Sequence, residues 1–497
     1  MPRLPKQMLI PTLLATGLMA MPAVASSVPA SPKHDRCVGT EAAGDQQPVP
    51  SDPYPLMAGG WGPELGGGLM ASRWAEDWSG MAAGRGVPRL KAIPVGHSAL
   101  LTLSAEARLR YVATDNSRLV RGDDTQQGQF RGVVGADLRL TPHLRFYGEL
   151  GTALVDRDRQ MAAANFQNRV SLQQVFVDMR GSTGSVVVGA MLGRQEFADG
   201  PRQLISLSDG PNLHRTWNGV RLYAHAPRYR IGAFEWRGTR LASGGVDDGI
   251  QSGTILRGIN GSIIVSRGDG PNTYLDLFWF HTELPGFRLG NEVGTDRRDT
   301  FGIRLWGHKG AFRWDWTTAR QSGHSLGARP IDAWGVFAVQ SLTLSESGWK
   351  PKFTSHIDLA TGGGMAEGGR LHNFHPLYGS SNYLGESQLL GLSNLLLVAP
   401  GIALSPSRNI TLSFEYGRAR RLDANDAAYA GRMRAYAGTQ NVSGHHIGNL
   451  MRLSSTWSVT PRVSLNLNVE HLAAGRVLTD AGLSSGTHAQ LGATYRY

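Results

Sequence analysis

The sequence predicts an all-β fold, a closed antiparallel transmembrane β-barrel of about 18 strands with short periplasmic turns and long extracellular loops. Three observations predict it. Apolar and polar side chains alternate with period two along many segments after residue 98. The connections between these segments alternate between long and short. Beyond the N-terminus, no run of about 20 apolar residues could form a transmembrane helix. Since backbone polar groups in hydrocarbon must bond internally, strands can span only as a closed sheet.

The final segment, 486–497, is the clearest strand. One face carries Ala489, Leu491, Ala493, Tyr495 and Tyr497, and the other carries Gln490, Gly492, Thr494 and Arg496. An unpaired strand edge invites aggregation. We therefore predict that 486–497 pairs with the first strand, 99–113, and closes the barrel. Arg496 would then face water inside, and Tyr495 and Tyr497 would lie at the periplasmic aromatic girdle.

The remaining strands follow from the same alternation. They are predicted at 127–141, 144–155, 168–180, 185–195, 214–225, 229–241, 254–267, 273–283, 298–309, 311–322, 329–344, 350–361, 391–404, 409–421, 447–460 and 463–472. Three of them, 168–180, 329–344 and 391–404, break the alternation, which predicts β-bulges.

The connections indicate which membrane the barrel spans. Short turns rich in Gly, Pro and Asn alternate with long polar loops at 114–126, 157–167, 196–213, 242–253, 284–297, 362–390, 422–446 and 474–485. Bacterial outer-membrane barrels show this asymmetry and have an even number of strands. A soluble β-sandwich or propeller has no reason to sort its loops in this way.

The N-terminus predicts export. Arg3 and Lys6 precede an apolar run and the sequence Ala23-Val24-Ala25, so residues 1–25 are interpreted as a cleaved signal peptide. Residues 26–71 are rich in Pro, Gly, Ser and Ala, which predicts a disordered periplasmic arm. The barrel is assigned to 72–497. The single cysteine, Cys37, excludes an internal disulfide framework.

The net charge and the inward faces predict anionic partners. Lys and Arg number 50 against 39 acids, and removing the signal peptide takes the net charge from +11 to +9. Rings of basic side chains select anions. The predicted pore-lining residues are Arg108, Arg110, Arg131, Arg139, Arg145, Arg194, Arg221, Arg304, Arg452, Glu106, Asp137 and Glu149. The alternative is that many of these charges only pair with one another inside a water-filled lumen.

Several segments resemble the alginate-export outer-membrane barrels. They are RWAEDWS, RLKAIPVG and LTLSAEARLRY before and in the first strand, Leu192–Glu196, Leu204–Ser206, Asn218–Leu222, Phe374–Gly379 and Gly391–Leu395. The resemblance covers about 72–497. It implies an 18-stranded monomeric pore lined by basic residues, through which an anionic polysaccharide leaves the cell, with Arg194 and Arg221 as pore residues. It also implies a periplasmic synthesis-and-export complex as a partner. The aromatic C-terminus resembles the signal read by the barrel-insertion machinery.

Other motifs predict less. Gly323–Gly327 matches the G-x-S-x-G nucleophile elbow, but that motif needs a strand before it and a helix after it. A hydrolase centred on Ser325 is therefore a third hypothesis only, and no enzyme is predicted. No spacing of residues predicts a metal site, a cofactor or nucleic-acid binding.

Two hypotheses for function follow. The first is a passive outer-membrane channel that exports an anionic, alginate-like exopolysaccharide through an arginine-lined pore. The alternative is a porin that takes up small anionic or sugar-like solutes. Besides the polysaccharide, the expected contacts are outer-membrane lipids.

Overall fold

A computed structural model describes residues 65–81, 87–157, 163–199, 201–266, 272–364, 369–380 and 382–497. The signal peptide predicted at 1–25 and most of the arm predicted at 26–71 lie outside the described residues. Those predictions therefore stay untested.

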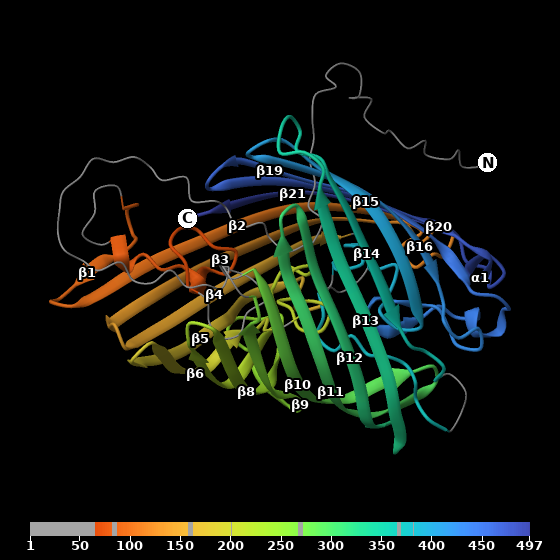
Figure 1. Ribbon diagram of the computed structural model, residues 1–497, viewed down its shortest axis with the longest axis horizontal. Helices are drawn as coiled ribbons and strands as arrows, with labels where there is room; N and C mark the ends of the chain where they lie inside the picture. The colour runs from red at the N-terminus through yellow and green to blue at the C-terminus, as the bar shows by residue number, and fades with distance from the viewer. Residues whose placement is uncertain are drawn as a thin grey trace, which may run out of the picture.

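Eighteen antiparallel strands form one closed barrel (Figure 1). They are β2 (Ala99–Asp115), β3 (Thr125–Thr141), β4 (Leu144–Arg157), β5 (Asn168–Thr183), β6 (Val186–Glu196), β7 (Thr216–His225), β8 (Tyr229–Arg240), β9 (Gly249–Ile264), β10 (Thr273–Leu289), β11 (Glu292–Lys309), β12 (Phe312–Ser325), β13 (Arg329–Thr343), β14 (Lys352–Ala360), β15 (Leu395–Ser407), β16 (Ile410–Arg420), β19 (His446–Thr460), β20 (Val463–Ala474) and β21 (Gly486–Arg496). Each pairs with the next along the chain, which confirms the predicted fold class.

The smaller elements are not among the eighteen strands of the barrel wall. A short strand, β1 (Ile93–Val95), pairs with the start of β2, and β17 (Tyr429–Ala430) pairs with β18 (Arg434–Ala435) in an extracellular loop. Short helical turns are η1 (Arg73–Ala75), η2 (Ser79–Met81), η3 (Gly431–Met433), η4 (Thr439–Asn441) and α1 (Arg476–Thr479). None of the helices in the described ranges is long and apolar enough to cross a membrane.

The first and last strands close the barrel, as predicted. β2 pairs with β21 from Glu106 opposite Arg496 to Asp115 opposite Thr487. Figure 1 shows the orange β2 beside the dark blue β21, at the edge where the chain ends. The side chain of Tyr495 is 43% exposed on the outer face. Arg496 instead points inward, where its Nε donates to Glu106 Oε2 over 2.9 Å.

Two details of the strand prediction are corrected. The segment 284–297 is no long loop, because β10 and β11 continue past a bulge after Leu284 to a tight turn at Gly290, whose φ is +56°. Glycine adopts this left-handed backbone at little cost. The predicted bulge in β5 is present, and β15 shifts register just after Leu404. β13 pairs with both neighbours without a shift, so the bulge predicted there was wrong.

Alternate residues face lipid and lumen, as period-two alternation requires. In β2, Leu109 is 60% exposed, whereas its inward neighbours Arg108 and Arg110 are buried. Trp316, Phe414 and Tyr416 are likewise exposed on the outer face. The inward residues are buried because other parts of the chain enter the lumen and cover them.

An N-terminal segment, residues 65–81, occupies the lumen near the short-turn end of the barrel. Gly66 and Ala75 share a backbone hydrogen bond of 2.9 Å, and Asp77 N–H returns to Gly66 O. Arg73 is 2% exposed and bonds to inward carboxylates of β2 and β4. The sequence analysis divided this stretch between the predicted arm, 26–71, and the barrel, 72–497, and did not predict that it enters the lumen.

Two extracellular loops fill the other side of the lumen. The loops 361–394 and 421–445 bury apolar residues against the inner faces of β8 to β16. Among them are Leu371, Phe374, Tyr383, Leu389, Leu390, Leu392, Tyr429, Met433 and Tyr436. The stretch 362–390, predicted as a long polar extracellular loop, therefore folds inward wherever it is described, because its apolar side chains pack in a core there.

Candidate functional site

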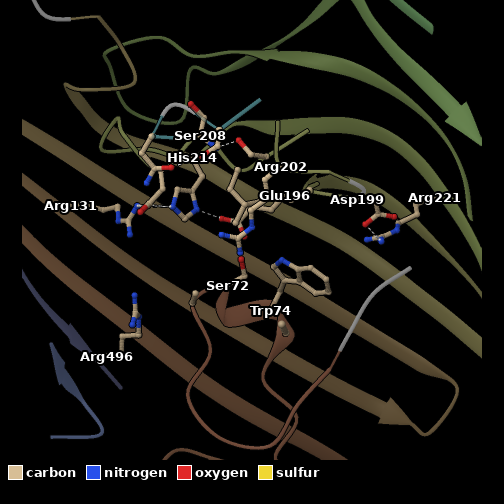
Figure 2. A pocket seen from close by; sticks show the side chains of 18 residues that line it. Ser72, Trp74, Arg131, Glu196, Asp199, Arg202, Ser208, His214, Arg221 and Arg496 are labelled. Carbon is tan, nitrogen blue, oxygen red and sulfur yellow. Dashed lines mark hydrogen bonds and ion pairs between the residues drawn. The ribbon is translucent and has the colours of Figure 1, made fainter. Parts of the chain in front are cut away.

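A cavity of about 260 Å³ lies in the lumen between the N-terminal segment and two inward-folded loops. Figure 2 shows Ser72 and Trp74 on one side and Ser208, His214 and Arg202 on the other. Its remaining walls come from the barrel: Arg131 from β3, Arg221 from β7 and Arg496 from β21. The cavity is the candidate site because charged side chains from the barrel strands and from the loop between β6 and β7 converge there.

The N-terminal segment is held in place by inward carboxylates. Arg73 Nη1 donates to Glu106 Oε2 over 3.0 Å, and its Nε donates to Glu149 Oε2 over 2.9 Å. All three side chains are buried, and each charge is hydrogen-bonded, as buried ions must be. Glu106 and Glu149, predicted to line the pore, therefore bind a part of the chain itself.

Two more predicted pore residues, Arg145 and Arg139, hold the same segment, and a third, Asp137, pairs with both of them. Arg145 donates to the backbone oxygen of Trp74, and its Nε lies 2.7 Å from Asp137 Oδ1. Arg139 Nη1 lies 2.7 Å from Asp77 Oδ2. These side chains are therefore engaged beneath the cavity and do not line it.

Arg108 and Arg110 secure the loop 197–215, which connects β6 to β7 and folds into the lumen. Arg108 Nη2 donates to Pro211 O over 2.7 Å, and its Nη1 contacts Asp209 Oδ1 at 3.0 Å. Arg110 Nη1 donates to Gly210 O over 2.9 Å. Five donors on a planar guanidinium suit such multiple acceptors. The loop is thereby fixed over the cavity.

Two titratable groups of that loop are strongly coupled. His214 bonds to Glu196 through Nδ1 and to Asp209 Oδ1 through Nε2, the latter over 2.8 Å. Enclosure by protein alone would lower the pKa of His214, but the Glu196 carboxylate raises it above its usual value. Enclosure would raise the pKa of Asp209, but the Arg108 guanidinium and His214 lower it well below the usual range. The loop therefore contributes a charge network to the cavity wall.

Arg131 and Arg221 are the two predicted pore residues that line the cavity. Each is paired: Arg131 with Glu106 and, at 3.1 Å, with Asp209 Oδ1, and Arg221 with Asp199. Both keep an Nε that has no hydrogen-bond partner among the described residues. Their positive charge is thus partly compensated by the protein.

Arg202, on the same inward loop, differs from these. Its side chain is exposed to the cavity and has no ion-pair or hydrogen-bond partner among the described residues. Desolvation by the surrounding protein, together with the Arg304 guanidinium, lowers the pKa of Arg202, and Asp315 and Asp209 offset this only in part. A bound anion would relieve this unfavourable environment. The sequence reasoning missed Arg202 because the residue lies on a loop and period-two alternation says nothing about loops.

The other predicted pore residues lie elsewhere. Arg194 donates to Asn218 Oδ1 and to Leu172 O, both over 2.9 Å, and does not reach the cavity. Arg304 pairs with Asp315 at 2.7 Å and Asp276 at 3.3 Å on neighbouring strands.

Arg452 lies on the part of the barrel wall that the extracellular loops cover. It pairs with Glu415 at 3.1 Å. Eleven of the twelve predicted residues are buried and Arg139 is half-buried, but only Arg131 and Arg221 line the cavity.

The motifs that suggested other chemistry are accounted for by the barrel. Ser325 is the last residue of β12 and is followed by a turn and β13, with no helix after it, so it lacks the geometry of a nucleophile elbow. Within the described ranges, no group of three His, Cys, Asp or Glu side chains is placed to hold a metal ion.

Comparison with known proteins identifies the barrel. The model of the "Alginate export" family matches residues 99–491. The chain belongs to the alginate export family. The family match confirms the resemblance noted in the sequence. Among curated proteins, no sequence matches this chain.

Solved structures share the fold. They include the outer membrane protein OpdK from Pseudomonas aeruginosa, with 13% identity, a TM-score of 0.53 and coverage of 80% of this chain and 98% of that one. OccK2 (OpdF) of the same organism, solved in complex with glucuronate, has 12% identity, a TM-score of 0.51 and coverage of 80% and 97%. OccK8 (OprE), also from that organism, has 10% identity, a TM-score of 0.52 and coverage of 80% and 98%. Family and fold together place this member of the alginate export family in the bacterial outer membrane as a channel.

Proposed function

We propose that this channel exports an anionic, alginate-like exopolysaccharide, which passes passively through the cavity lined by Arg202, Arg131 and Arg221. The observation that carries the proposal is Arg202, exposed in the cavity with no carboxylate partner in the described chain. A guanidinium matches a carboxylate in two-point geometry, so it suits the repeated carboxylates of a uronate polymer.

Flanking acids limit how tightly such a polymer is held. Asp209 and Glu196 lie in the same cavity wall as the arginines. Conduction requires binding strong enough for entry and weak enough for release. Alternating charges of both signs meet this requirement for a polymer that must move on.

The second candidate is a porin for small anionic or sugar-like solutes. The size of the cavity favours it, because about 260 Å³ is below the range of roughly 300–1,000 Å³ in which proteins bind drug-sized ligands. With the N-terminal segment in the lumen, the cavity suits one sugar unit better than a length of chain.

Single-channel recording in planar bilayers tests the proposal. We expect uronate oligomers added from the periplasmic side to block the current transiently, and Arg202→Glu to abolish the block and reduce anion selectivity. Arg320→Gln is the matched control, since Arg320 lies on the outer face with its side chain 73% exposed.

Oligomer length separates the two candidates. Blocks that lengthen with the number of uronate units indicate passage of a polymer. Blocks by single uronates only, with no effect of longer oligomers, would exclude passage of a polymer and leave the porin as the remaining candidate. No response of the block to Arg202→Glu would contradict both.

A further inference from the structure

Trp74 is placed in the cavity by the N-terminal segment and has no assigned role. It lies outside the region that the family model matches, and it reaches the cavity because the segment enters the lumen. The flanking Arg73 is fixed by two buried ion pairs, and the backbone oxygen of Trp74 accepts from Arg145. The indole is therefore held in one position.

The indole ring is only partly covered. The ring meets Phe176 in a T-shaped contact with centroids 6.3 Å apart and packs against the buried cluster that contains Phe176, while the side chain as a whole is half-buried. Figure 2 shows the ring beside Ser72, facing the space below Glu196, Asp199 and Arg221. A partly exposed aromatic ring in the wall of a polar cavity suits a ligand with an apolar ring face and polar edges, which describes a pyranose.

We propose that Trp74 is a sugar-binding residue of the pore: its indole face stacks on a pyranose ring of the saccharide in the cavity, while Arg221 and Arg202 take the carboxylate of that sugar or its neighbour. Stacking on the ring adds discrimination by shape to discrimination by charge. Small inorganic anions meet only the arginines, whereas a uronate meets both. The inference rests on the proposed function and adds a recognition element that the barrel strands do not contain.

The experiment compares Trp74→Ala, Trp74→Phe and the control Trp78→Ala in single-channel recordings with a uronate trisaccharide. Trp78 belongs to the same segment but points away from the cavity, with its ring 5.4 Å from Lys91 Nζ. We expect Trp74→Ala to shorten the residence time of the blocker about tenfold, which corresponds to about 1.4 kcal/mol, the upper range for aromatic contacts. Trp74→Phe should keep most of the residence time, and Trp78→Ala all of it.

Chloride distinguishes stacking from obstruction. If Trp74 stacks on the sugar, chloride selectivity stays unchanged in Trp74→Ala. An unchanged residence time in Trp74→Ala, or equal shortening in Trp78→Ala, overturns the inference. Should Trp74→Ala fail to give the heat-resistant barrel on a gel, Trp74→Leu and Trp74→Phe together make the same comparison of ring against no ring.

The two proposals fail differently. If Trp74→Ala has no effect while Arg202→Glu abolishes the block, the stacking inference is wrong and anionic transport stands. If neither variant changes the block, the proposed function is wrong.

Discussion

The two sides of the lumen use inward charges in different ways. On the side of β2 to β7, arginines bind chain segments that have entered the lumen, as Arg108 binds the 197–215 loop, and they border a wet cavity. On the side of β10 to β16, charges pair between neighbouring strands, as Arg304 does with Asp315, and apolar loops cover them. The difference teaches that the loops, more than the strands, decide which inward arginine can meet a solute.

The largest effect is expected from unpacking the covered side. Asn394 is fully buried and joins the two filling loops, because its Nδ2 donates to Ala427 O over 3.0 Å and its Oδ1 accepts from Asp423 N–H. Asn394→Ala leaves several buried backbone groups unpaired at about 1–3 kcal/mol each. We expect the loops to detach and the conductance to rise with added noise, measured in planar bilayers. Asn409→Ala, at an exposed periplasmic turn, is the control. Unchanged conductance would show that the covered side is not sealed by these loops.

Releasing the N-terminal segment should have the next largest effect. Arg73→Ala removes the buried cation that Glu106 and Glu149 share, and breaking such pairs costs about 3–5 kcal/mol. The segment should leave the lumen, become open to protease and raise the conductance severalfold. Arg118→Ala, an exposed ion pair in an extracellular loop, should do neither. A protected segment in Arg73→Ala would mean that its backbone contacts suffice.

The comparison predicts opposite outcomes for two arginines. Arg304→Gln should destabilise the barrel by about 3 kcal/mol, because Asp276 and Asp315 stay buried without their partner, and should change ion selectivity less than Arg202→Gln does. Arg202→Gln should reduce anion selectivity and leave stability unchanged. Urea unfolding and reversal potentials measure the two quantities. A shift in selectivity from Arg304→Gln as large as that from Arg202→Gln would break the distinction between the two sides.

The smallest expected effect is a pH dependence of the current, arising on the side of the lumen that contains the cavity. The pKa of His214 is raised in the folded protein by Glu196, so the stabilisation from protonated His214 is fully present below its ordinary pKa of about 6.5 and is lost as pH rises through the raised value. The ionic contacts of His214 that fix the 197–215 loop should therefore weaken toward alkaline pH. Current fluctuations recorded from pH 6 to 9 should grow with pH and become independent of it in His214→Gln. Equal pH dependence in both proteins would exclude His214 as the cause.

The strands could be predicted from the sequence because their signal is local. Alternation along 99–113 and 486–497 is visible residue by residue, and each strand then pairs with its neighbour along the chain. The hairpin at Gly290 was missed because a polar sequence was taken for a loop, although Gly-Asn is a known hairpin signal.

The cavity could be predicted only in part. Arg131 and Arg221 followed from inward positions, but Arg194 has the same kind of position and is occupied by Asn218 and a backbone oxygen. Arg202 and Trp74 depend on segments that enter the lumen, which is a tertiary event. Phe374 and Leu377, apolar residues in a supposed outer loop, were the available sign that a loop packs inside.

Glu106 has a consequence for the order of assembly. Its carboxylate accepts from Arg131 on the neighbouring strand, from Arg496 on a strand 390 residues later, and from Arg73 of the N-terminal segment. The first partner is in place as soon as a hairpin forms, whereas the second needs closure of a loop of about 390 residues, and contacts of long sequence separation form slowly because of the entropy lost. We expect the Glu106 carboxylate to lack its full set of arginine partners until β2 pairs with β21. A barrel whose first and last strands are still apart would then contain a buried, incompletely paired carboxylate.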